Sequence, residues 1–216
     1  MERGGIFMYT PASFGMHDAE TFELMRSYPF ATLCSVSNTD MLVSHVPLVF
    51  KEASMTLHGH FAAANPHAKI PEGSTVLAIF HGPHSYISSG WYEEERAVPT
   101  WNYQVVHAKG TIHFYEENEL RDSDLKQLIL QHDPHLPLVD SLHEGWVQAM
   151  ARGIRGFYIS VKQLEGKSKL NQNRSLEDQR RVAQRLQHSN REEEREVASR
   201  MDKNLKTRHP SDGAEG

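Results

Sequence analysis

The feature that most limits the possible folds is a series of short apolar runs separated by turn residues. β-Branched and aromatic residues bounded by Gly, Pro, Asn and Ser are typical of β-strands. A parallel sheet requires regular alternation of strands with helices, and this chain lacks it. The pattern therefore predicts an α+β fold with a mostly antiparallel sheet that closes as a barrel. The runs cover residues 30–36, 41–50, 55–58, 75–80, 105–115 and 154–161.

Helical patterns flank the strands. Asp18 is placed to cap a helix with Phe22 and Met25 on one face, and Pro29 ends it. The alanines at 62–64 favour a helical turn after the third strand. Helices are therefore expected at the edge of the barrel.

The C-terminal part of the chain is highly charged and has a different periodicity. Val197, Met201 and Leu205 recur every four residues, which predicts a helix capped by Ser189 or Asn190. We expect a barrel domain over residues 1–174, a helical extension over 175–208 and a disordered tail over 209–216.

Composition excludes several classes of protein. The chain has 216 residues, of which 38% are hydrophobic, and no apolar run approaches the roughly 20 residues that span a bilayer. The first residues lack a secretory signal, so we expect a cytoplasmic protein with no membrane contact. The single cysteine, Cys34, lies in an apolar run and is expected in the core.

The overall charge argues against a general nucleic-acid-binding surface. The formal net charge is -5, whereas phosphate neutralisation requires clustered Lys and Arg. The sequence shows no helix-turn-helix pattern. We therefore expect DNA binding to be weak or indirect.

Three segments contain side chains suited to ligand binding. Residues 82–110 carry Trp91, Trp101 and Tyr103, which would wall a planar ligand or fill a dimer interface. Residues 166–174, GKSKLNQNR, would bind a phosphate and polar ring edges, or form solvated surface. Residues 58–67, HGHFAAANPH, would place backbone N–H groups at a helix start that attracts phosphate, or form an ordinary junction. No zinc, Rossmann or P-loop pattern is present, and no catalytic or metal-binding residue is predicted.

Together these segments resemble one known family, the PaiB family of FMN-binding negative transcriptional regulators. The resemblance covers most of residues 8–188, and several of the matching strings are long and unusual. The strings are MYTPASF (8–14), PFATL (29–33), HVPLV (45–49), GHFAAANPH (59–67), IFHGPHSYISSGWY (79–92), VPTWNYQVVHAKG (98–110) and GKSKLNQNR (166–174).

The resemblance implies a flavin-binding split β-barrel, related to pyridoxamine-phosphate oxidases and heme-degrading enzymes and usually a homodimer with its ligand at the subunit interface. It also implies negative control of extracellular protease synthesis and of sporulation. Two other functions stay open: a flavin- or heme-dependent oxidoreductase, and an interaction protein without a cofactor.

The resemblance and the residues together predict an FMN site. The phosphate is expected near the segment that begins at Gly59, with the ring against the second strand and the Trp101 loop. Ala63 and Asn171 depart from the arginine and serine common in the family, and the first change removes one cation from the predicted phosphate site. The predicted cofactor-binding residues are Val43, His45, Pro47, Gly59, His60, Asn65, Trp101, Lys169, Gln172 and Arg174.

Overall fold

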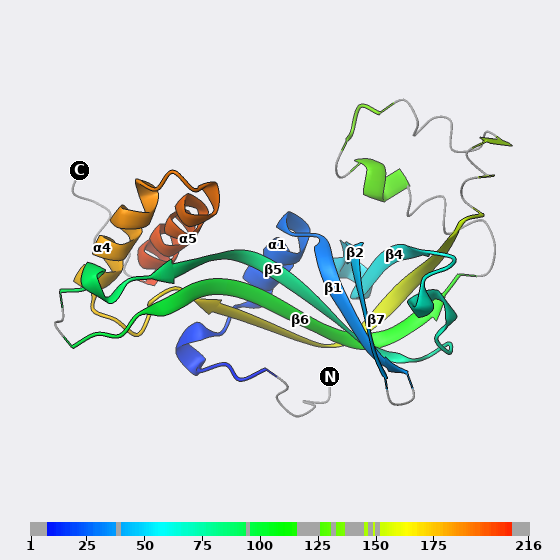
Figure 1. Ribbon diagram of the computed structural model, residues 1–216, viewed down its shortest axis with the longest axis horizontal. Helices are drawn as coiled ribbons and strands as arrows, with labels where there is room; N and C mark the ends of the chain where they lie inside the picture. The colour runs from blue at the N-terminus through cyan, green and yellow to red at the C-terminus, as the bar shows by residue number, and fades with distance from the viewer. Residues whose placement is uncertain are drawn as a thin grey trace. The chain divides into compact units, whose positions relative to one another are not determined.

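The structure is a computed structural model that describes residues 8–37, 40–93, 96–115, 126–130, 133–136, 145–146, 149 and 152–208. The predicted tail at 209–216 lies outside the described residues. The helices are α1 (Asp18–Ser27), α4 (Leu176–Gln187) and α5 (Glu192–Arg208), with short 3-10 turns η1 (Ala12–Phe14), η2 (Glu52–Ser54), η3 (Pro66–Lys69) and η4 (Ser89–Trp91). The strands are β1 (Phe30–Ser37), β2 (Asp40–Pro47), β3 (Val49–Lys51), β4 (Thr56–Ala62), β5 (Thr75–Ile87), β6 (Thr100–Phe114) and β7 (Ile154–Lys169) (Figure 1).

In the described part of the chain the strands form a seven-stranded sheet in the order β2-β1-β5-β6-β7-β4-β3. Strand β1 pairs antiparallel with β2 and β5, and β4 pairs antiparallel with β3 and β7. Strand β2, at one end of this order, also contacts β4, which lies near the other end. The sheet therefore curls back on itself, which confirms the predicted α+β class and antiparallel barrel.

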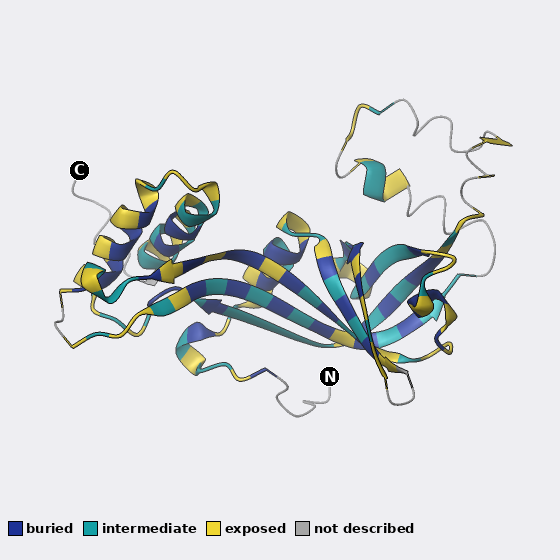
Figure 2. Ribbon diagram, viewed as in Figure 1, coloured by how far each residue is buried: buried dark blue, intermediate teal, exposed yellow. Residues whose placement is uncertain are grey.

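The chain divides into two compact units, and β5, β6 and β7 contribute residues to both. Of the described residues, those within Asp18–Phe80 and Val106–Glu165 form unit 1. Unit 2 comprises Met8–His17, His81–Val105 and Gly166–Gly216. Along β5 and β6, buried residues alternate with half-buried or exposed ones (Figure 2).

Unit 1 has an apolar core built from alternating strand residues and one helix face. Leu24 and Met25 of α1 are fully buried, as the predicted helix requires. Phe61 of β4 and Phe157 of β7 stack with their ring centroids 4.3 Å apart. Cys34 of β1 is only half-buried, so its expected place in the core is wrong. Its neighbours Leu33 and Ser35 point inward instead, because side chains alternate along a strand.

Unit 2 has its own core, in which α4 and α5 pack side by side (Figure 1). Ser175 caps α4 by accepting a hydrogen bond from the Asp178 N–H at 3.1 Å. The predicted stripe on α5 is confirmed for Val197 and Met201, which are buried. The buried members of this core are Ile87, Tyr92, Leu170, Val182, Ala183, Leu186, Val197, Ala198 and Met201.

The structure corrects three local predictions. Strands β5 and β7 continue to Ile87 and Lys169, well beyond the predicted ends at 80 and 161. No helical turn forms at 62–64, because β4 continues through Ala62 and the turn that follows is the 3-10 turn η3. Asn65 caps η3 by accepting a hydrogen bond from the His67 N–H at 2.9 Å. None of the described helices is long and apolar enough to cross a membrane.

Candidate functional site

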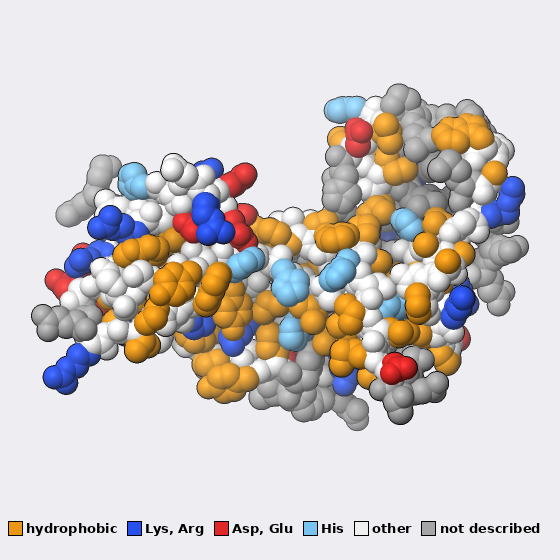
Figure 3. Space-filling view, in the orientation of Figure 1, with side chains coloured by type: hydrophobic (Ala, Val, Ile, Leu, Met, Phe, Trp, Pro, Cys, Tyr) orange, Lys and Arg blue, Asp and Glu red, His pale blue; other side chains and the backbone are white. Residues whose placement is uncertain are grey.

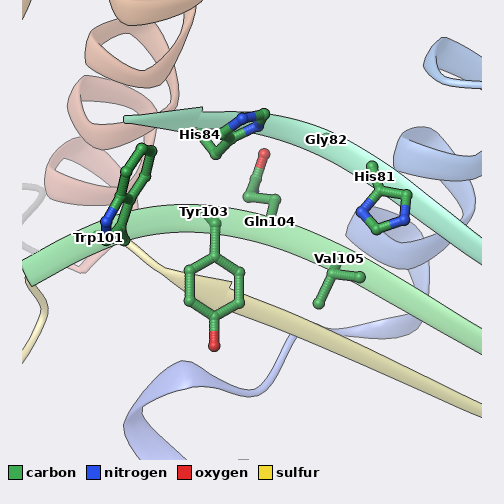
Figure 4. Close-up of a pocket in the computed structure, with 7 residues that line it drawn as sticks. All are labelled: His81, Gly82, His84, Trp101, Tyr103, Gln104 and Val105. Atoms are coloured by element: carbon green, nitrogen blue, oxygen red, sulfur yellow. The ribbon is translucent and has the colours of Figure 1, made fainter. Parts of the chain in front are cut away.

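A cleft of about 370 Å³ lies on β5 and β6 within unit 2, and we call it the β5–β6 cleft (Figure 4). Its volume lies in the range of small-molecule sites, roughly 300–1,000 Å³. Its position follows from the two long strands, which run beside each other in the sheet. The lining residues are His81, Gly82, His84, Trp101, Tyr103, Gln104 and Val105.

Aromatic rings form one wall of the β5–β6 cleft. The Trp101 ring lies 5.9 Å from the His84 ring and 6.1 Å from the Tyr86 ring, measured between centroids. Trp101 nevertheless stays 53% exposed, so its face is accessible to a planar ligand. His84 also pairs with Glu193 of α5, with 2.8 Å between Nδ1 and Oε1.

Buried amides hold β6 in place next to the β5–β6 cleft. Gln104 Nε2 donates a hydrogen bond to Ser168 Oγ on β7 at 3.0 Å. Asn102 Nδ2 contacts Met201 Sδ on α5 at 3.5 Å. Because both amides are buried, they fix the strand that carries Trp101 and Tyr103.

Two lysines from the end of β7 lie beside the residues that line the β5–β6 cleft. Lys169 Nζ donates hydrogen bonds to Thr100 Oγ1 and, at 2.6 Å, to the Trp101 carbonyl oxygen. Lys167 Nζ donates to the Tyr9 carbonyl oxygen at 2.9 Å and lies 5.4 Å from the centroid of the Tyr103 ring. Among the described residues, neither ammonium group contacts a carboxylate.

The electrostatics of Lys169 show that this region is rich in positive charge. Burial lowers the pKa of Lys169, and the nearby charges of Lys167 and Arg174 lower its pKa further. The Arg174 guanidinium lies over the Tyr92 ring, 4.7 Å from its centroid. We call Lys167, Lys169 and Arg174 the cation cluster. A bound anion would relieve the mutual repulsion of these groups.

The turn that joins β7 to α4 is held by its own amide side chains. Asn171 has a φ of 65°, a left-handed conformation that Asn tolerates better than most residues. Its Nδ2 donates to the buried Tyr92 hydroxyl at 3.1 Å. Gln172 Oε1 accepts from the Leu170 N–H and its Nε2 donates to the Ser168 carbonyl oxygen, each at 2.6 Å.

A second polar group lies inside unit 1, between β2 and η3. Ser44 Oγ lies 2.8 Å from His67 Nδ1 and accepts a hydrogen bond from Asn65 Nδ2 at 3.1 Å. The His67 ring stacks on Phe61 with centroids 5.4 Å apart. Burial lowers the pKa of His67, and burial also lowers the pKa of His60 on β4. Both imidazoles therefore favour the neutral form.

Comparison with known proteins identifies the family. The family model described as "Putative FMN-binding domain" matches residues 8–163. The "Protease synthase and sporulation protein PAI 2" of Bacillus subtilis strain 168 is 34% identical over 206 residues, covering 92% of this chain and 99% of that protein. The chain belongs to this FMN-binding domain family. The predicted resemblance to the PaiB-type family is confirmed.

Solved structures share the fold of this family member. The flavocytochrome Anf3 from Azotobacter vinelandii superposes with a TM-score of 0.58 at 13% identity, covering 72% of this chain and 69% of that chain. The FAD and Heme binding protein from Mycobacterium smegmatis gives a TM-score of 0.56 at 12% identity, covering 71% of each chain. Both likenesses support the predicted split-barrel fold.

The structure divides the predicted cofactor-binding residues between the two units. In unit 1, Val43, His45 and Pro47 lie on β2 and Gly59 and His60 on β4. A Cβ atom at Gly59 would lie 3.1 Å from the Pro47 carbonyl oxygen, so these two strands approach closely. His45 Nδ1 lies 3.2 Å from Thr32 Oγ1. Because Gly59 and His60 are strand residues, the helix start expected to bind phosphate there is absent.

In unit 2 the structure brings Trp101 and Lys169 into direct contact, as the hydrogen bond between them shows. Sequence reasoning missed Lys167 and His84 as site residues, although both lie inside the strings that match the family. It also missed the Ser44–His67 pair. His67 is the last residue of the GHFAAANPH string that matches the family, and this match could have identified it as a candidate site residue.

Proposed function

We propose that this protein binds FMN, with the isoalloxazine ring in the β5–β6 cleft and the phosphate at the cation cluster. The observation that carries the proposal is the hydrogen bond from Lys169 Nζ to the backbone carbonyl oxygen of Trp101, a residue that is 53% exposed, in a chain whose family model describes an FMN-binding domain. Because the helix start expected at Gly59 is absent, the proposal moves the phosphate to Lys167, Lys169 and Arg174. The other predicted cofactor-binding residues stay predictions for the site: Val43, His45, Pro47, Gly59, His60 and Asn65.

The chemistry of the donor groups fits this ligand. FMN combines a planar ring, which aromatic side chains bind, with a phosphate that Lys and Arg bind. The hydrogen bonds of Lys167 and Lys169 go to neutral carbonyl and hydroxyl oxygens, which leaves their charge available to a phosphate. Gln172 uses both ends of its amide within its own turn, so it supports the position of Lys169 and Arg174.

Titration of FMN into the wild type and into Lys169→Gln with Arg174→Gln tests the proposal. Loss of charge-assisted contacts worth about 1.5–3 kcal/mol each should weaken binding by at least about tenfold. Flavin fluorescence quenching and the visible spectrum give the dissociation constant. Lys109→Gln with Lys162→Gln is the matched control, because both lysines are exposed strand residues outside the cation cluster. Equal affinities in all three proteins, or no binding at millimolar FMN, would contradict the site.

The biological role that we propose is the one that the family resemblance implies. The similar Bacillus subtilis protein is named for protease synthesis and sporulation. We propose a regulator that exerts negative control over extracellular protease synthesis and sporulation and acts in the cytoplasm. A net charge of -5 favours weak or indirect contact with DNA.

We further propose that the functional protein is a homodimer. Large apolar side chains are exposed in unit 2, including Tyr86 at 49%, Val98 at 67% and Trp101 at 53%. Figure 3 shows hydrophobic side chains at the surface over the end of β5 and β6 nearest α4. A second copy of the chain would cover such a patch, which soluble monomers rarely expose.

Sedimentation equilibrium tests the homodimer. We expect the wild type to have twice the 24.6 kDa mass of one chain, and Tyr86→Lys with Val98→Lys to shift the protein toward the monomer. Val98 does not line the β5–β6 cleft, whereas the Tyr86 ring lies beside Trp101, so Val98→Lys alone separates dimer formation from contact with the ligand. A wild-type mass of one chain at all concentrations would refute the dimer.

A further inference from the structure

A second cavity in unit 2, of about 510 Å³, lies between α4 and the turn η4. It shares no lining residue with the β5–β6 cleft. It is lined by Gly90, Trp91, Arg181, Gln184, Arg185 and His188, and we call it the α4–η4 cavity. Its size is again that of a small-molecule site.

The lining of the α4–η4 cavity follows from the helical repeat of α4. Residues 181, 184, 185 and 188 lie at i, i+3, i+4 and i+7, so their side chains share one face of the helix. Val182, Ala183 and Leu186 occupy the opposite face and are buried in the core of unit 2. The packed face of α4 therefore fixes the helix and presents two arginines to the cavity.

The aromatic side of the cavity is also held in place. Trp91 packs partly against the core of unit 2. Ser88 caps η4 by accepting a hydrogen bond from the Gly90 N–H at 3.3 Å. Beyond η4, the Glu93 N–H donates to the buried Asp178 Oδ1 of α4 at 2.7 Å. Hydrogen bonds therefore hold the chain just before and just after Trp91, and its ring lines the cavity in a fixed position.

The charge of the α4–η4 cavity is positive. Among the residues that the structure describes, no Asp or Glu lines it. Arg181 and Arg185 are exposed and make no hydrogen bond or ion pair with the other residues that the structure describes. One carbonyl oxygen at the C-terminal end of α4 already has a partner, because His188 Nδ1 donates to the Gln184 carbonyl oxygen at 2.8 Å. Both guanidinium groups are therefore available for an anion.

We propose that the α4–η4 cavity binds a small phosphorylated ligand with an aromatic ring, of the nucleoside phosphate class. Arg181 and Arg185 bind the phosphates, because a guanidinium matches phosphate oxygens in bidentate geometry. Trp91 stacks on the base, as aromatic side chains do with nucleobases. Gln184 supplies an amide that both donates to and accepts from the polar edge of the base or sugar. The site is independent of the FMN proposal and would add a second ligand to the same unit.

The test uses the full-length protein and ADP as the probe, with binding followed by calorimetry. We expect ADP to bind the wild type, and Arg181→Gln with Arg185→Gln to weaken it by about tenfold or more. Arg180→Gln with Lys206→Gln is the matched control. It removes the same charge from exposed positions on α4 and α5 that do not line the cavity. Adenosine and pyrophosphate, which each lack one half of the proposed ligand, should both bind more weakly than ADP.

Three results would overturn the proposal. The first is no heat of binding at millimolar ADP in wild-type protein that is folded by circular dichroism. The second is equal ADP affinity in the wild type and in the Arg181 and Arg185 variant. The third is a pair of observations: FMN displaces ADP, and the double variant Lys169→Gln with Arg174→Gln no longer binds ADP. Together they would place ADP in the β5–β6 cleft. Failure of FMN binding alone leaves ADP binding unchanged, so the two proposals fail separately.

Discussion

Gly110→Ala is expected to destabilise unit 1 strongly. Gly110 lies in β6, where a Cβ atom would be 2.3 Å from the Ser160 carbonyl oxygen and 2.8 Å from Ile159 Cγ2. The obstacle is backbone of the neighbouring strand β7, which cannot move without disrupting the sheet between β6 and β4. Overpacking of cores costs about 1–3 kcal/mol and occasionally more, and a backbone clash should reach at least the upper value. Since domains are stable by roughly 5–15 kcal/mol, a large part of the stability would be lost.

Urea denaturation followed by circular dichroism measures this effect, and soluble yield gives a second readout. Gly15→Ala is the matched control, because its new Cβ would make only an ordinary contact, 3.8 Å from the Ala12 carbonyl oxygen. The control should stay within about 0.5 kcal/mol of the wild type. A Gly110→Ala protein with an unchanged denaturation midpoint would show that β6 and β7 are farther apart than the structure places them.

Much of the fold could be predicted from local patterns, but the lengths of the strands could not. The run at 75–80 consists of apolar residues after Thr75 and predicts a strand, whereas its continuation through Gly82 and Pro83 contains the residues that usually mark turns. The segment 162–169 is polar, yet it continues β7. Pairing with neighbouring strands overrides local composition in both cases, because each added residue gains ladder hydrogen bonds and packing.

The candidate site shows the same limit. Trp101 and Lys169 were both predicted from their own segments, but their contact joins residues 68 positions apart. Such a pairing depends on the register between strands, which one sequence does not reveal. The α4–η4 cavity could not be predicted from the sequence for a different reason. Arg181 and Arg185 lie in a highly charged region whose pattern is typical of a solvated helix face.

Phe61→Ala is expected to cause the second large loss of stability. Phe61 is 1% exposed and stacks between Phe157 and His67, with ring centroids 4.3 Å and 5.4 Å away. Replacing a buried Phe by Ala removes transfer free energy and leaves a cavity, which together cost about 3–5 kcal/mol. Phe61→Leu keeps most of the apolar volume and should lose clearly less. Chemical denaturation of the three proteins gives the free energies of unfolding.

A second measurement separates this packing role from a general loss of structure. Burial holds the pKa of His67 below its ordinary value of 6.5, and the Phe61 ring covers one face of the imidazole. Opening that face to water should stabilise the charged form, so the pKa of His67 should rise toward 6.5 in folded Phe61→Ala. The pKa of His60, which burial also lowers, provides an internal reference. NMR titration of the imidazole signals checks both groups. An unchanged pKa of His67 beside a large loss of stability would mean that Phe61 supports the core without shielding the histidine.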